Sequence, residues 1–157
     1  MSWDEIKQVL EKMCVKPFGK QAQIPWAAEE LAQLLAHKCA QYKVDPRLAL
    51  AQGILESHMG CNPQASRSRK TKNLWNVGNV DDGGNRYFPT WEDGLAAYLR
   101  LMAREYCWRE EGDVVTPEMM IAHDFTRPRG GRYATAPSYT KDIAAIVQKI
   151  DKLVAGK

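Results

Sequence analysis

Apolar residues recur at helical spacing along most of this chain. The first stretch starts at Ser2 and Glu5, a capping-box pair, and predicts a helix over about residues 3–13. Pro17 and Gly19 then predict a loop over residues 14–24. Asp45 followed by Pro46 predicts the start of a helix that ends near Gly60. Other helices are predicted over about 25–41, from Thr90 to about Tyr106, from Thr116, and over about 137–153.

The middle of the chain has a different pattern. Residues 61–90 are rich in Asn, Gly, Asp, Ser and Pro and show no helical period. The turn signal Asp82-Gly83-Gly84 lies between short apolar pieces and predicts a small β-hairpin. We therefore expect a mostly α, α+β fold with a small β insertion, in a single domain over residues 1–157.

Composition places the chain among soluble globular domains. It has 157 residues, 45% hydrophobic and 26% charged, which excludes a disordered chain, a collagen-like chain and a coiled-coil rod. No apolar run approaches the roughly 20 residues needed to cross a bilayer. The start, MSWDEIKQVLEK, lacks an apolar signal segment and a small-residue cleavage site, so we expect synthesis in the cytoplasm without a signal peptide.

Charge and cysteine content exclude several partners. The net charge of +3 permits a polyanionic partner but does not require one. The basic run over residues 67–72 lacks the interleaved aromatic residues of a nucleic-acid patch, so no nucleic-acid partner is expected. Four scattered cysteines without a CxxC pair, and only three histidines, predict reduced thiols and no metal site. No cofactor is implied.

Glu56 is the candidate for chemistry. It lies about one turn before the end of an otherwise apolar helix, and its own face carries Gln52 and Gly53, where small side chains would leave space over the carboxyl. Apolar neighbours raise the pKa of a carboxyl, and a carboxyl that titrates near neutrality can donate a proton to a leaving oxygen. The alternative is a solvated residue in the last helical turn.

A second candidate segment is NLWNVGN, residues 73–79. Three Asn and a Trp suit a carbohydrate, because amides both donate and accept hydrogen bonds and an indole offers a flat face. The alternative is an Asn-rich turn with a packing Trp.

Four segments occur in an order that resembles a known superfamily: ILESHMG, NLWNVGN, FPTWEDGLAAYLRLMAREY and RYATAPSYTKDIAAIV. Together they are similar to the lysozyme-like peptidoglycan-cleaving enzymes, especially lytic transglycosylases and endo-N-acetylglucosaminidases, over about residues 44–150. The resemblance implies a helical body, a small β-hairpin lobe and a cleft between them. It also implies cleavage of the β-1,4 bond between N-acetylmuramic acid and N-acetylglucosamine.

The resemblance also implies roles for single residues. Glu56 matches the catalytic acid/base, and Ser57 matches a neighbour that hydrogen-bonds in the site. The residues that match substrate-binding positions are Asn73, Trp75, Asn76, Tyr133 and Tyr139.

The mechanism depends on whether there is a second carboxylate. Hydrolysis usually needs one, and the candidates are Asp81 and Asp82, which also fit a simple turn. A transglycosylase uses a hydroxyl of the substrate as nucleophile and needs only one acid/base. We therefore expect a lytic transglycosylase, with a hydrolytic muramidase or N-acetylglucosaminidase as the alternative.

The resemblance implies glycan strands of peptidoglycan as partner, and a monomer is expected. The setting would be the cell wall, reached as a phage lysin or virion-associated protein or through a secretion or tail-like apparatus. The basic run over residues 67–72, with Arg127, Arg129 and Arg132, could face anionic wall polymers or only solvent. A glycan-binding or assembly module that has lost turnover is the alternative of another class.

Overall fold

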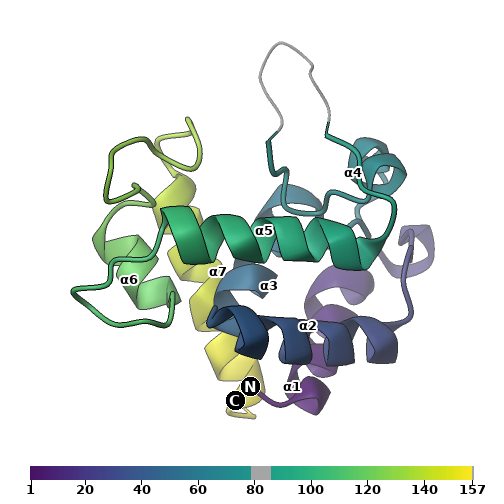
Figure 1. Cartoon of the computed structure of the whole chain (residues 1–157). Helices are drawn as coiled ribbons and strands as arrows, with labels where there is room; N and C mark the ends of the chain where they lie inside the picture. Colours follow the sequence, from purple (N-terminus) through teal and green to yellow (C-terminus); the bar gives the residue numbers. More distant parts are fainter. Residues whose placement is uncertain (79–85, 157) are drawn as a thin grey trace.

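The computed structural model describes residues 1–78 and 86–156. This part of the chain is mostly helical, with long loops between some of the helices (Figure 1). Its elements are α1 (Trp3–Val9), η1 (Leu10–Val15), η2 (Lys16–Gln21), α2 (Ala28–Tyr42), α3 (Pro46–Ser57), α4 (Ser66–Thr71), α5 (Trp91–Glu105), α6 (Pro117–Ala122) and α7 (Tyr139–Val154).

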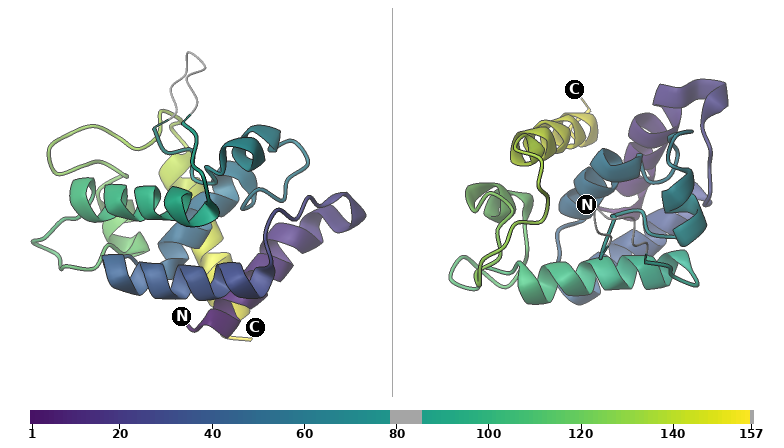
Figure 2. Two further views of the ribbon diagram at one scale, coloured as in Figure 1. Left: turned by 45° about the vertical axis from the view of Figure 1, so that its right-hand side comes forward. Right: turned by 90° about the horizontal axis from the view of Figure 1, so that it is seen from above.

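Helix α3 lies at the centre of the fold because it is apolar on every side. Its buried residues are Leu48, Ala49, Leu50, Ala51, Gln52, Gly53, Ile54 and Ser57. A helix without a polar face is stable only when other elements cover it all round. Helices α2 and α7 contact α3, while α1 and α5 pack against α2 (Figures 1 and 2).

The amphipathic helices cover this centre with one face each. Helix α5 buries Leu95, Tyr98, Leu99 and Met102, and α7 buries Tyr139, Ile143, Val147 and Ile150. Their exposed positions are almost all polar, as the spacing predicts.

The helix starts predicted from capping residues are confirmed. The Ser2 hydroxyl accepts a hydrogen bond from the Glu5 N–H, and the Glu5 carboxylate accepts one from the Ser2 N–H. Asp45 accepts from the Arg47 N–H at the start of α3, with Pro46 in the first helical position. The side chains of Thr90 and Thr116 cap α5 and α6 in the same way.

Two predictions about loops are wrong. Residues 10–21, most of which were expected to lie outside a helix, continue α1 as a π-helical segment (η1) and a 3₁₀ segment (η2). Pro17 is accommodated because it occupies the start of η2, where its missing N–H costs little. Residues 66–71, inside the region without helical period, form the short helix α4, whose one buried residue is Thr71.

The expected β-hairpin lobe is not seen in the described residues, which contain isolated bridges but no strand. The turn of the predicted hairpin, with Asp81 and Asp82, lies in 79–85, outside the described residues. The Phe88 N–H donates to the Thr71 carbonyl at 2.9 Å, and this bond is not extended into a ladder along 71–78 and 86–90. The helical body is as expected.

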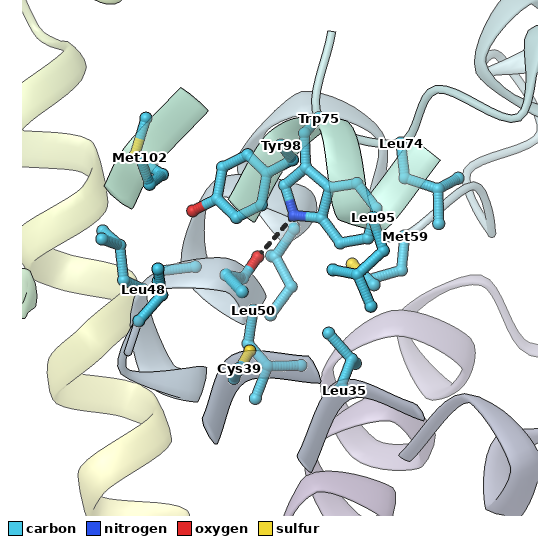
Figure 3. Packing of buried hydrophobic residues seen from close by; sticks show 14 of the residues in the cluster. Leu35, Cys39, Leu48, Leu50, Met59, Leu74, Trp75, Leu95, Tyr98 and Met102 are labelled. Carbon is cyan, nitrogen blue, oxygen red and sulfur yellow. Dashed lines mark hydrogen bonds between the residues drawn. The ribbon is translucent and has the colours of Figure 1, made fainter. Parts of the chain in front are cut away.

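Long-range contacts of Trp75 join the loop after α4 to the core (Figure 3). Its indole N–H donates to the Ala49 carbonyl at 2.8 Å, and its ring stacks on Tyr98 with a centroid distance of 5.1 Å. The Ala49 carbonyl belongs to α3 and Tyr98 to α5, so this one side chain connects two helices to the 72–78 loop.

Other expectations concern thiols and membranes. Cys14, Cys39 and Cys61 are buried and Cys107 is partly buried, all as free thiols, as the sequence predicts. A search of the described helices finds none with the length and apolar content of a membrane span.

Candidate active site

A cleft of about 730 Å³ opens at the carboxyl end of α3. Its walls come from α3, the 76–78 loop, α5, the segment after α6 and the start of α7. The residues that line it are Leu55, Glu56, Asn76, Val77, Gly78, Leu101, Tyr106, Arg127, Arg132, Tyr133, Ala134, Thr135, Ala136, Tyr139 and Asp142.

Glu56 lies in the wall of this cleft with its side chain half-buried. Burial raises the pKa of Glu56 from 4.5 to about 7, while the Arg67 guanidinium and a hydrogen bond from Tyr139 oppose that rise. The position near the C-terminus of α3 also disfavours a negative charge. Around neutrality the carboxyl therefore exists in both protonation states.

The expected local reason for the open space at Glu56 is wrong. Gly53 does not leave room above the carboxyl, because core side chains fill the space beside its Cα. A Cβ at Gly53 would lie 2.2 Å from the Met59 Sδ and 3.1 Å from the Trp75 Nε1. The space in front of Glu56 belongs to the cleft between α3, α5 and α7.

A chain of buried hydrogen bonds leads to the carboxyl. The Tyr98 hydroxyl donates to Gln52 Oε1 at 2.5 Å, and Gln52 Nε2 donates to the Tyr139 hydroxyl at 3.0 Å. The Tyr139 hydroxyl hydrogen-bonds Glu56 in turn. Burial and the nearby Glu56 charge raise the pKa of Tyr139 above its usual range, so its phenol stays protonated and can donate. We call Tyr98, Gln52 and Tyr139 the tyrosine–glutamine relay.

Tyr133 forms the next part of the wall. Its hydroxyl donates to the Trp75 carbonyl at 2.8 Å, and its ring stacks on Tyr139 at a centroid distance of 5.7 Å. Both predicted tyrosines therefore lie beside Glu56 and line the cleft. Their contact with substrate stays a prediction.

Three residues expected to bind substrate are buried instead. Ser57, Asn73 and Trp75 are 2%, 1% and 1% exposed, so they present no surface to a glycan. Ser57 Oγ donates to the Leu74 carbonyl and accepts from the Gly60 N–H. Asn73 bonds both the N–H and the carbonyl of Val77, each at 2.9 Å. Their side chains fix the 73–78 loop, which forms one edge of the cleft.

Among the residues of that segment predicted to bind substrate, Asn76 lines the cleft, next to Val77 and Gly78. Its backbone has a φ of 56°, a left-handed conformation that Asn tolerates better than most residues. Its Oδ1 accepts from the Arg67 guanidinium at 2.9 Å, which connects α4 to the cleft edge. Asp81 and Asp82 lie outside the described residues.

Arg132 shapes the opposite wall. Its guanidinium donates to the carbonyls of Ala134 and Ala136 at 3.0 and 2.7 Å and to the Asp124 carboxylate at 3.2 Å. Thr140 at the start of α7 donates to the same carboxylate. Arg132 therefore holds the 132–136 loop against the start of α7, and its contact with an anionic wall polymer stays a prediction.

The sequence interpretation missed Gln52 as a relay member and Asp142 as a second carboxylate in the cleft wall. A polar residue inside an apolar helix was the available signal for Gln52. Asp142 follows Tyr139 by three residues and so shares its helix face. No group of three or more potential metal ligands occurs among the described residues.

A mostly helical domain with one half-buried carboxyl of raised pKa in the wall of an open cleft has the features of a lysozyme-like glycosidase. The family comparison agrees. The chain belongs to the glucosaminidase family, described as mannosyl-glycoprotein endo-beta-N-acetylglucosaminidase, whose family model matches residues 32–152. This is a lysozyme-like family of peptidoglycan-cleaving enzymes. Comparisons with curated proteins and with solved structures gave no significant match.

The relay predicts that Gln52 and Tyr98 contribute to stability as a coupled pair. Gln52→Leu leaves two buried hydroxyls without their partner and should lower the free energy of unfolding by about 1–3 kcal/mol. Tyr98→Phe should cost less, because Gln52 keeps its bond to Tyr139. Urea unfolding of both single variants and the double variant should give a coupling free energy of at least ~0.5 kcal/mol. Additive effects would show that no such coupling exists.

The raised pKa of Glu56 predicts a stability cost of ionisation. In the unfolded chain the carboxyl ionises near 4.5, but in the folded protein near 7. Its favourable contribution is therefore complete below pH 4.5 and is lost as the pH rises through 7. Glu56→Gln should be similar in stability to the wild type at pH 4.5 and more stable by ~1–3 kcal/mol at pH 8. Thermal unfolding at both pH values measures this, with the exposed Glu110→Gln as control. An advantage that does not grow with pH would contradict the raised pKa.

Proposed function

We propose that this protein cleaves the β-1,4 bond between N-acetylmuramic acid and N-acetylglucosamine in peptidoglycan, with Glu56 as general acid/base. The observation that carries the proposal is a half-buried carboxyl with a pKa of about 7 in the wall of a cleft of about 730 Å³. Membership of a glucosaminidase family supports a peptidoglycan glycosidase in general.

In the proposed reaction the protonated Glu56 donates its proton to the glycosidic oxygen as the bond to the anomeric carbon breaks. The resulting carboxylate then takes a proton from the nucleophile that attacks this carbon. In a lytic transglycosylase that nucleophile is a hydroxyl of the same muramic acid residue, and the product carries an anhydro ring. One carboxyl with a pKa near the working pH is sufficient for both proton transfers.

The tyrosine–glutamine relay supports this cycle by orienting the acid. The Tyr139 hydroxyl receives a hydrogen bond from Gln52, which turns its own proton toward Glu56. The carboxyl is thereby held in one orientation, and its ionised form after proton transfer keeps a donor. A donor of this kind offsets part of the desolvation that raises the pKa.

Hydrolysis remains the second candidate because Asp142 also lines the cleft. Its Oδ2 accepts from Ser138 Oγ at 2.9 Å at the start of α7, where a carboxylate also favours the helix dipole. These contacts account for Asp142 as a helix-start residue, so we favour the transglycosylase. Action on the cell wall, as a phage-borne lysin or as part of a secretion or tail-like apparatus, belongs to the same proposal.

Removal of the acid tests the proposal directly. Glu56→Gln should lower the rate of peptidoglycan cleavage by at least about 100-fold, the size expected for a general acid. For the wild type, cleavage should fall as the pH rises above about 7, because the proton donor is then ionised. Turbidity loss of purified sacculi measures both, and Glu110→Gln is the matched control on the surface. A Glu56→Gln protein that keeps most of its activity excludes Glu56 as the acid, and a wild type that cleaves no type of wall favours a binding module.

Product analysis distinguishes the two mechanisms. Mass spectrometry should find anhydro-muramyl ends. The Asp142→Asn variant should keep a cleavage rate within roughly tenfold of the wild type, because the loss of about 100-fold is expected only when the general acid is removed. Reducing ends, together with loss of activity in Asp142→Asn, Asp81→Asn or Asp82→Asn, would instead indicate a hydrolase and identify its second carboxylate.

A further inference from the structure

A smaller hollow of about 210 Å³ lies beside the cleft and shares Val77 and Leu101 with it. Its other lining residues are Arg86, Ala97, Arg100, Arg104 and Glu105. We call this hollow the arginine groove. Because two residues line both spaces, the groove is a side branch of the cleft rather than a separate site.

The charge of the arginine groove is strongly positive. Three arginines line it against one carboxylate, Glu105, which lies 3.9 Å from the guanidinium of Arg127 in the cleft. Arg100 and Arg104 are exposed, and no hydrogen bond or ion pair involves their side chains within residues 1–78 and 86–156. Two cations therefore remain available to an anionic ligand.

The placement of these arginines is unfavourable for the helix alone. Arg100 and Arg104 are four residues apart on α5, a spacing at which like charges repel. The helix dipole explains a cation in the last turn, where Arg104 lies, but not a second one a full turn earlier. A bound anion would convert this repulsion into attraction.

The lining also has an apolar part, formed by Val77, Ala97 and Leu101. A guanidinium matches a carboxylate with two parallel hydrogen bonds, whereas apolar side chains match methyl groups. The groove thus suits a short peptide that contains both carboxylates and alanine methyls. Such a peptide is attached, through a lactyl group, to the muramic acid residues of peptidoglycan.

We propose that the arginine groove binds the carboxylates of the stem peptide that branches from a muramic acid residue in the cleft. This inference rests on the proposed function, which places the glycan in the cleft beside Glu56. A substituent on a sugar in the cleft leaves the glycan sideways, and the groove opens beside the cleft at Val77 and Leu101. Phosphate-containing wall polymers are the competing anion, but they are not attached to every muramic acid residue.

Binding to a protein that cannot turn over tests the inference without requiring cleavage. Calorimetry on Glu56→Gln would compare a purified disaccharide–tetrapeptide with the same disaccharide lacking the peptide. The peptide should tighten binding roughly five- to tenfold, as expected for two exposed charge pairs, and the gain should shrink in 0.5 M salt. In the Arg100→Gln/Arg104→Gln double variant, the gain should fall to less than twofold.

The matched control is Arg109→Gln/Lys149→Gln, which removes the same charge from exposed positions that line neither the cleft nor the groove. It should keep the full peptide-dependent gain. Equal weakening for both ligands in the groove variant, or no weakening at all, would overturn the inference. Soluble polyglycerol phosphate serves as a third ligand. If the groove variant lost affinity for this polymer alone, that would also overturn the inference, since the groove would then bind phosphate.

Cleavage assays separate failure of this inference from failure of the proposed function. On peptide-bearing strands freed of phosphate polymers, the groove variant should have a KM raised roughly five- to tenfold with little change in kcat. On strands stripped of their peptides by an amidase, it should match the wild type. A wild type that binds the muropeptide through the groove but cleaves neither substrate would reject the proposed function and leave the groove assignment standing.

Discussion

The burial of α3 on all sides is the constraint on which the other features depend. A helix without a polar face must be enclosed, and α2 and α7 contact it while the loop after α4 reaches it through Trp75. Enclosure ends at the last turn, where α3 meets the cleft. Glu56 occupies that boundary, with enough protein around it to raise its pKa to about 7 and enough opening to meet a ligand.

A buried helix also carries a polar residue at a cost that must be offset. Gln52 is fully buried, and its amide is satisfied by Tyr98 on one side and Tyr139 on the other. Because these tyrosines belong to α5 and α7, the hydrogen bonds that satisfy Gln52 also fix the relative position of three helices. The same bonds orient the hydroxyl that contacts Glu56, so core packing and site geometry depend on one set of atoms.

Much of the helical body could be predicted from periodicity and caps, as Asp45-Pro46 and Thr90 show. The place of Glu56 at the end of an apolar helix predicted a side chain beside open space, and the cleft wall holds it, while its catalytic role stays a prediction. Gly53, however, makes room for Met59 and Trp75 and not for a ligand. Trp75 was misinterpreted because local composition does not reveal a partner as distant in sequence as Ala49. Asn73 was misinterpreted because its amide bonds the backbone of the nearby Val77 and is buried there. Gln52 was missed for the same reason as Trp75, since Tyr98 and Tyr139 follow it by 46 and 87 residues. The helix α4 has only one buried residue and therefore gave no apolar period to recognise.

The electrostatics of the cleft follow from where each charge can be solvated. Glu56 is desolvated and can be neutral near pH 7, whereas Arg100 and Arg104 on the adjoining rim are exposed and keep their charge at little cost. An anionic group on the ligand is therefore attracted to the rim, whereas a second negative charge beside Glu56 would raise the pKa of that carboxyl further. A branched ligand with its uncharged sugars in the cleft and its carboxylates on the rim meets both conditions. In the proposed complex, this division of one continuous surface into a neutral acid and a cationic rim would orient the glycan, independently of how the bond is broken.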